Sequence, residues 1–137
     1  MRDIETREDL EEILFSFYSK ALADNVIGHI FTDIAKLDLA EHLPVITDFW
    51  EMLLFGNGNF QKKYGRSPMQ KHVELNEKIR LEKLHFERWL KLFSETIDEN
   101  FQGFYAGLAK QRAVSIAQTM ILKFTRETFP GVRVVRE

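Results

Sequence analysis

Cysteine is absent from this 137-residue sequence, and neither acidic nor basic side chains form a run. The absence of cysteine excludes disulfides, cysteine-ligated zinc, cysteinyl iron–sulfur clusters and thiol nucleophiles. Any metal must therefore be held through His, Asp, Glu, Tyr or Met. The 19 basic and 21 acidic side chains nearly cancel, so the chain lacks the positive field that binding a phosphate backbone requires. We expect no nucleic-acid partner.

Long hydrophobic runs are also absent. No stretch reaches the roughly 18 to 20 apolar residues of a membrane span, and the acidic N-terminus lacks the basic and apolar regions of a signal peptide. We expect a cytoplasmic protein with no membrane partner, and a monomer. The 45% hydrophobic content suffices for one packed domain over residues 1–137, with its core at about 8–128 and a tail at 129–137.

The apolar residues of the first long segment recur with the period of an amphipathic helix. Thr6 is a plausible N-cap, with Asp9 three residues further on. The short apolar piece Val26–Phe31, interrupted by Gly28, is too brief for a full helix and predicts a tight helical turn. The apolar positions of the first helix are Leu10, Ile13, Leu14, Phe17, Ala21 and Leu22.

A second amphipathic stripe runs from Leu39 to Leu54 and stops at Gly56-Asn57-Gly58, which is a strong helix C-terminal signal. Pro44 lies inside this stripe and costs helix stability unless it falls in the first turn. We therefore expect the helix either to begin near Leu43 or to bend there.

Residues 56–67 are polar, glycine-bearing and aperiodic. Ser67-Pro68 resembles an N-cap followed by proline at the first helical position, which predicts a short helix through His72. Two further helices are predicted at about Arg80–Glu99 and Phe104–Thr128.

The last of these helices is ended by Phe129-Pro130-Gly131, and period-two alternation is confined to the short tail Val132–Val135. The predicted fold class is all-α. Four long helices around an aperiodic middle do not suit a simple up-and-down bundle, because such a bundle has short loops between equal helices. A haem, whose porphyrin is a large apolar plate, would fill the space that these helices leave.

The side chains suited to haem chemistry each have an ordinary structural alternative. His72 stands near Met69 and Leu75, where a neutral imidazole could ligate iron, but a surface histidine would look the same. His42 ends an inward-facing row, whereas Tyr18 and Trp89 lie on or beside apolar stripes. Taken singly, each of these three is more often a structural residue than a functional one.

Other chemistries fit the sequence poorly. Glu82-Lys83-Leu84-His85 has the Glu-x-x-His spacing of di-iron carboxylate sites, but those sites need two such motifs and no other histidine has a glutamate three residues before it. No pair of histidines is spaced to share a helix face around zinc. Phosphate-binding glycine loops and the G-x-S-x-G serine elbow are missing.

Taken together, the motifs resemble the group III truncated haemoglobins, which are bacterial globins with a two-over-two helical sandwich. The resemblance covers about residues 10–125. It rests on the order of short motifs along the chain: Phe17-Tyr18, Gly28-His29-Ile30-Phe31, Glu41-His42, Phe49-Trp50, Met52-Leu53-Leu54, Gly56-x-Gly58, Lys71-His72 and Trp89-Leu90-Lys91-Leu92-Phe93.

This resemblance implies haem b, with His72 as the iron ligand and an open sixth position for dioxygen or another diatomic ligand. It implies that Tyr18, His42 and Trp89 line the distal side and that Phe31 packs on the haem. Arg66, Lys71 and Arg80 are expected near the haem propionates on the basis of their charge. The remaining contacts expected with the haem are Ile46, Phe49, Trp50, Leu53, Leu54, Met69, Leu75, Phe86 and Phe93.

Three functions follow from these expectations. The first is reversible binding of dioxygen and other small gaseous ligands, with Tyr18 and Trp89 as hydrogen-bond donors. The second is a peroxidase-like or nitric oxide detoxifying enzyme that uses the same haem. Because the chain has no flavin or nicotinamide domain, such turnover would need an external reductase. The third is a haem-free helical interaction module, in which these side chains are only core and surface.

Overall fold

The computed structural model describes residues 1–56, 72, 74–76 and 78–124. Every regular element within these ranges is helical, which confirms the predicted all-α class. The elements are, in chain order, α1 (Arg7–Leu22), the π-helix η1 (Ile30–Ile34), α2 (Leu39–Phe55), α5 (Lys83–Asn100) and α6 (Phe104–Phe124). None of the helices described is long and apolar enough to cross a membrane.

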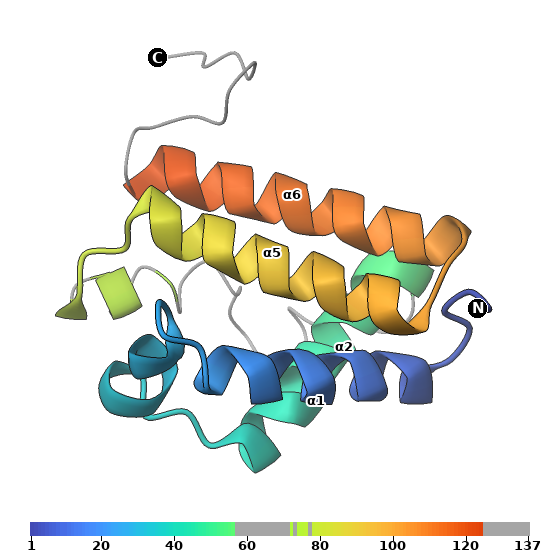
Figure 1. The fold of residues 1–137 in the computed structure, drawn as a ribbon, viewed down its shortest axis with the longest axis horizontal. Helices are drawn as coiled ribbons and strands as arrows, with labels where there is room; N and C mark the ends of the chain where they lie inside the picture. The colour runs from blue at the N-terminus through green and yellow to red at the C-terminus, as the bar shows by residue number, and fades with distance from the viewer. Residues whose placement is uncertain (57–71, 73, 77, 125–137) are drawn as a thin grey trace.

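The four long helices form two packed pairs (Figure 1). α5 lies beside α6 in one layer, and α1 packs on α2 in the other. α1 also packs against α5, and this contact joins the two layers. The arrangement agrees with the two-over-two sandwich expected from the resemblance.

The start of α1 is fixed by its side chains, as the sequence predicts. The Thr6 hydroxyl accepts a hydrogen bond from the Asp9 backbone N–H at 3.2 Å, and the Asp9 carboxylate accepts one from the Thr6 N–H at 3.1 Å. This reciprocal capping box satisfies N–H groups that have no partner within the helix. Arg2 also donates to the Asp9 carboxylate, which is almost fully buried.

α2 begins at Leu39. The predicted start near Leu43, which was one of two alternatives, is therefore wrong. Asp38 caps the helix by accepting a hydrogen bond from the Glu41 N–H at 3.3 Å, and Pro44 then lies in the second turn. The far end agrees with the prediction. Gly56 has a φ of 73°, a left-handed conformation that glycine adopts without strain, and its N–H donates to the Met52 carbonyl.

The turn predicted over Val26–Phe31 follows α1, and its last two residues belong to η1. The Gly28 N–H donates to the Asp24 carbonyl at 2.9 Å, and η1 follows directly. Gly28 is required by close approach, since a Cβ atom there would lie 2.7 Å from the Leu22 carbonyl oxygen.

α5 begins at Lys83, three residues later than predicted. The physical reason is that Leu81 is buried and its N–H donates to the Asn76 side chain at 2.9 Å, so the chain before Glu82 is held by non-helical contacts. Several predictions fall outside the described residues. These are the Ser67-Pro68 helix start, the end of α6 near Thr128, the Phe129-Pro130-Gly131 stop and the tail Val132–Val135.

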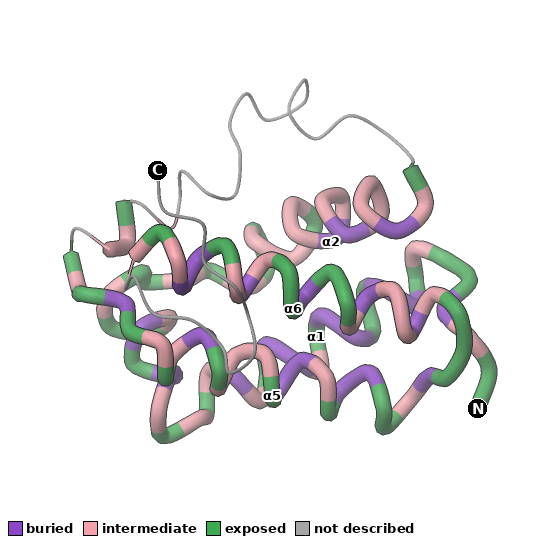
Figure 2. The backbone as a smooth tube through the Cα atoms, turned by 90° about the horizontal axis from the view of Figure 1, so that it is seen from above, coloured by how far each residue is buried: buried purple, intermediate pink, exposed green. Residues whose placement is uncertain are grey.

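Buried residues recur along each long helix between more exposed ones (Figure 2). The packed core extends further toward the N-terminus than residue 8, because Ile4 is fully buried. Asp3 holds this segment in place by accepting hydrogen bonds from the Tyr105 and Ala106 N–H groups, both at 2.9 Å, at the start of α6.

Candidate functional site

An apolar cavity that is partly open to solvent lies between the two helical layers, and the empty space within it and at its open mouth together amounts to about 930 Å³. The described residues that line it are predominantly apolar and come from every helical element: Leu14, Phe17, Tyr18, Ile27, Ile30, Phe31, Ile46, Phe49, Trp50, His72, Leu75, Leu81, His85, Phe86, Trp89, Phe93, Ile116, Ala117 and Met120.

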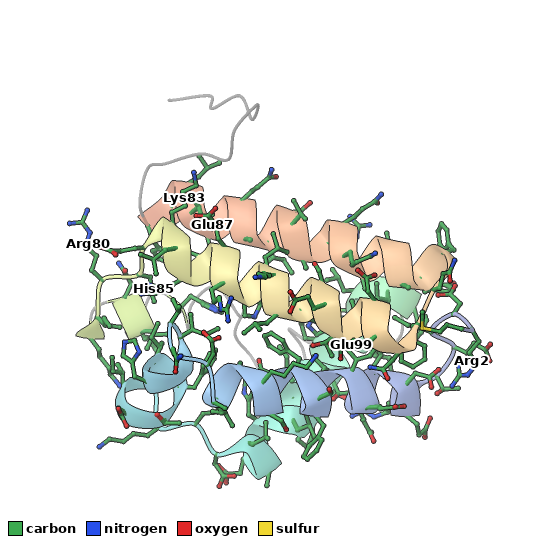
Figure 3. All side chains as sticks on the ribbon, in the orientation of Figure 1. Arg2, Arg80, Lys83, His85, Glu87 and Glu99 are labelled. Carbon is green, nitrogen blue, oxygen red and sulfur yellow. The ribbon has the colours of Figure 1, made fainter. Side chains whose placement is uncertain are left out.

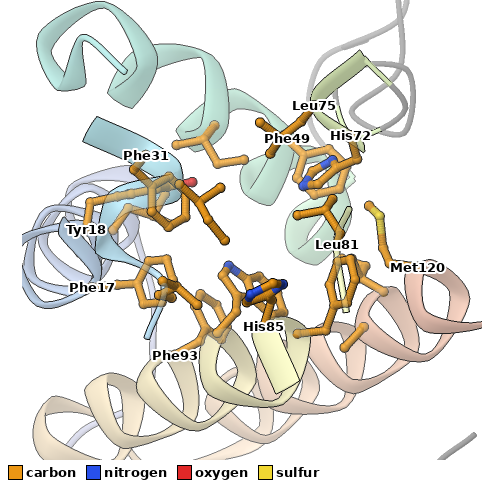
Figure 4. Close-up of a pocket in the computed structure, with 18 of the residues that line it drawn as sticks. Phe17, Tyr18, Phe31, Phe49, His72, Leu75, Leu81, His85, Phe93 and Met120 are labelled. Carbon is orange, nitrogen blue, oxygen red and sulfur yellow. The ribbon is translucent and has the colours of Figure 1, made fainter. Parts of the chain in front are cut away.

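His72 and Tyr18 lie on opposite sides of this cavity (Figure 4). Tyr18 comes from α1 and has Phe17 and Phe31 beside it. His72, whose backbone is helical, lies near Leu75 on the other side. The apolar space is therefore bounded by an imidazole on one side and a phenol on the other.

The Tyr18 hydroxyl is paired with His42. Its oxygen lies 3.1 Å from His42 Nε2, and the two rings meet edge to face with their centroids 5.2 Å apart. His42 is not among the residues that line the cavity, but it contacts Tyr18, which is. Burial raises the pKa of Tyr18 well above its ordinary value, so the phenol keeps its proton.

Trp89 is held by an aromatic stack with two other residues of the cavity wall. Its ring lies nearly parallel to Phe93, with centroids 5.5 Å apart, and Phe93 stacks in turn on Trp50 at 4.8 Å. Phe17 meets both Trp89 and Phe93 edge to face. Contacts of this kind fix the plane of the indole ring.

The wall that carries Ile27, Ile30 and Phe31 is tied to α5 by one carboxylate. Arg88 donates to Asp24 Oδ1 from Nε at 2.9 Å and from Nη2 at 2.6 Å. The other oxygen, Asp24 Oδ2, accepts hydrogen bonds from the backbone N–H groups of Val26 and Ile27. These contacts hold the pKa of Asp24 below its usual range, with the Arg88 hydrogen bond as the largest cause.

The structure brings together most of the predicted site residues that it describes. Leu53 and Leu54 belong to the core but not to the cavity wall, because they lie about one turn beyond Trp50 toward the end of α2. Arg80 is exposed and points away from the helices (Figure 3). Arg66, Met69 and Lys71 lie outside the described residues. The predicted residues in the wall are Tyr18, Phe31, Ile46, Phe49, Trp50, His72, Leu75, Phe86, Trp89 and Phe93.

Sequence reasoning did not assign His85 to the cavity, although its ring lies in the wall. The signal was present, because His85 lies four residues before Trp89 and so shares its helix face. The other lining residues that were missed are apolar: Leu14, Phe17, Ile27, Ile30, Leu81, Ile116, Ala117 and Met120.

These features fit a haem. An apolar space would accept the flat macrocycle, the His72 imidazole is a suitable iron ligand, and the Tyr18 hydroxyl stands on the opposite side. Over the ranges that the structure describes, no group of three His, Asp or Glu side chains is arranged to hold a bare metal ion.

Comparison with known proteins gives an independent result. No family model matches the chain. The Group 3 truncated hemoglobin ctb of Campylobacter jejuni is 30% identical over 124 residues, which cover 86% of this chain and 92% of that protein. The crystal structure of a group III truncated hemoglobin from Campylobacter jejuni superposes with a TM-score of 0.77 at 28% identity, covering 92% of this chain and 97% of that one. The chain therefore belongs to the group 3 truncated haemoglobin family.

Proposed function

We propose that this chain binds haem b in the cavity with His72 as the iron ligand, and that it binds dioxygen and similar diatomic ligands beside Tyr18. The observation that carries the proposal is the placement of an imidazole and a tyrosine hydroxyl on opposite sides of one apolar cavity. Membership of the truncated haemoglobin family supports it.

His72 would hold the cofactor through a neutral ring nitrogen, which is the form that binds metals. Haem, when bound, supplies an iron atom with an open coordination position at which a diatomic ligand gains negative charge. Leu75 and Met120, which also line the cavity, would pack against the macrocycle and keep water from the imidazole.

Tyr18 would act as a hydrogen-bond donor to the ligand. Its buried phenol stays protonated, and a hydrogen bond to a charged acceptor contributes about 1.5 to 3 kcal/mol. His42 Nε2 can accept a hydrogen bond from the Tyr18 O–H while the cavity holds no ligand. When Tyr18 turns its O–H toward a ligand, the other neutral tautomer of His42 can donate to the Tyr18 oxygen.

Trp89 would be the second donor, through its indole N–H. The stack on Phe93 fixes the indole plane, so little side-chain entropy is lost when the N–H engages a ligand. Two donors in a cavity that is otherwise apolar would slow the escape of a polar ligand far more than that of a weakly polar one.

The absorption spectrum of the purified protein with added haem tests the proposal. The wild-type chain should give an intense Soret band, and His72→Ala should abolish or strongly weaken it. His29→Ala is a matched control, because His29 is exposed and does not line the cavity. A wild-type protein that stays colourless, or a His72→Ala variant with an unchanged spectrum, would overturn the assignment.

A further inference from the structure

One hydrogen bond fixes which nitrogen of His85 carries the proton. The backbone N–H of Glu82 donates to His85 Nδ1 at 2.9 Å. A backbone N–H is always a donor, so Nδ1 must present its lone pair, and a neutral ring then carries its proton on Nε2. His85 therefore differs from His72, because its remaining ring nitrogen is an N–H donor and cannot ligate a metal.

The His85 ring is part of the cavity wall and is also partly exposed. It projects among the lining side chains (Figure 4), yet it is only half-buried, whereas the neighbouring Phe86 is buried. It belongs to the first turn of α5, next to the exposed residues Glu82 and Leu84. Within the described part of the chain, no hydrogen bond to its Nε2 is observed.

The surroundings of His85 favour the neutral ring, chiefly through burial. Burial lowers the pKa of His85, the Glu82 carboxylate acts in the opposite direction, and His29 on the facing turn lowers it further. The described residues of the cavity wall include no lysine or arginine. His85 is thus a partly exposed N–H donor in a wall that is mostly apolar.

A haem has one edge that needs such a donor. Its two propionate carboxylates are ionised at neutral pH and costly to bury without hydrogen bonds, so they must lie at a solvent-facing edge with N–H partners. The rest of the macrocycle suits the apolar wall.

We propose that His85 donates a hydrogen bond from Nε2 to a carboxylate of the molecule in the cavity, and that it marks the edge at which the haem propionates lie. This inference rests on the proposed function, because it takes haem as the occupant. It assigns to the two cavity histidines different tasks, iron ligation for His72 and carboxylate recognition for His85.

Comparison of haem b with its dimethyl ester tests the inference, because esterification removes the charged acceptor. The measurement is the rate of haem transfer to excess apomyoglobin. His85→Phe keeps an aromatic ring but removes the donor, and should release haem b about 10- to 100-fold faster than wild type while releasing the ester at the wild-type rate. His85→Gln keeps an N–H donor and should restore most of the retention of haem b.

The ester also controls for structural damage. If replacing His85 only loosened the start of α5, by removing its contact with Glu82, both porphyrins would be released faster by the same factor. That result would overturn the inference, and so would unchanged release of both. If wild type takes up neither porphyrin, the proposed function fails as well. Normal uptake without a difference between acid and ester defeats only the role of His85.

A second measurement needs no variant. In wild-type protein with ¹⁵N-labelled histidine, diamagnetic zinc protoporphyrin should move the His85 Nε2–H resonance downfield, and its dimethyl ester should not. An identical resonance with both porphyrins would also overturn the inference.

Discussion

The Tyr18 hydroxyl lies 3.1 Å from Nε2 of His42, although the two residues belong to different helices and are 24 positions apart in the sequence. The pairing couples the direction of the Tyr18 O–H to the tautomer of His42. A tyrosine held in this way can donate a hydrogen bond to a ligand while its own oxygen accepts a hydrogen bond from the histidine N–H. This relationship underlies the first prediction.

Tyr18→Phe should release dioxygen from the haem-loaded protein about 10- to 100-fold faster than wild type, which corresponds to the loss of one hydrogen bond to a charged acceptor. Release of carbon monoxide, which carries little charge, should change by less than about threefold on the same reasoning. Stopped-flow ligand replacement measures both rates. Tyr105→Phe is the matched control, because Tyr105 lies on α6, packs against Phe55 and does not line the cavity.

His42→Leu extends the same measurement into a double-mutant cycle. If His42 acts through Tyr18, its replacement should speed dioxygen release in the wild-type background and have little further effect when Tyr18 is already phenylalanine. Equal effects of Tyr18→Phe on both gases would contradict the donor role, and fully additive effects would contradict the coupling.

Gly28→Ala should destabilise the folded protein by about 1 to 3 kcal/mol, because the added Cβ would lie 2.7 Å from the Leu22 carbonyl oxygen and backbone would have to move. Gly107→Ala is the control, since a Cβ there meets nothing within 4 Å and α6 should gain up to about 1 kcal/mol from the better helix former. Urea denaturation of both variants measures the difference. Equal free energies of unfolding would show that the turn before η1 can relax.

The Asp9 carboxylate should make the stability of the fold dependent on acid pH. Its pKa lies well below the ordinary 3.8, chiefly because of the Arg2 hydrogen bond, assisted by the Glu5 and Thr6 N–H groups. Folding therefore favours the charged form. The contribution is present above pH 3.8 and is lost as the pH falls below it, toward the lowered pKa of the folded state.

Asp9→Asn should accordingly lower the free energy of unfolding by about 1 to 3 kcal/mol at pH 7. The gap to wild type should narrow as the pH falls from about 5 to 2. Urea titrations across this range provide the measurement. Asp98→Asn is the control, because its ion pair with Lys110 is exposed and should contribute less than about 1 kcal/mol. A gap that is independent of pH would argue against the charged contacts of Asp9.

Local sequence signals were sufficient where the determinant is itself local. Thr6 with Asp9 marked the start of α1, and Gly56 marked the end of α2, because capping needs only residues within one turn. The start of α5 was predicted too early, because Leu81 is held by the Asn76 side chain, a contact that periodicity does not encode.

The main residues of the candidate site were predictable from the family resemblance, but the contacts between them were not. The family resemblance pointed to His72, Tyr18 and Trp89, and all three lie in the cavity wall. Periodicity alone could not have paired Tyr18 with His42, because nothing in the sequence gives the distance between α1 and α2. His85 was missed for the opposite reason. It was considered only as part of a Glu-x-x-His motif, and its shared face with Trp89 was not used.

The Asp24–Arg88 pair has a mechanical consequence for the cavity. The Asp24 carboxylate accepts hydrogen bonds from the turn before η1 and also from Arg88 on α5. The segment with Ile27, Ile30 and Phe31 is therefore attached to α5, the helix that carries Trp89, as well as to α1, which precedes it in the sequence. The ion pair thereby holds this segment and α5, which form two sides of the cavity, at a fixed separation. Moving this segment away from α5 requires breaking the charge-assisted hydrogen bonds between Asp24 and Arg88. Rotation of an apolar side chain alone would leave them intact.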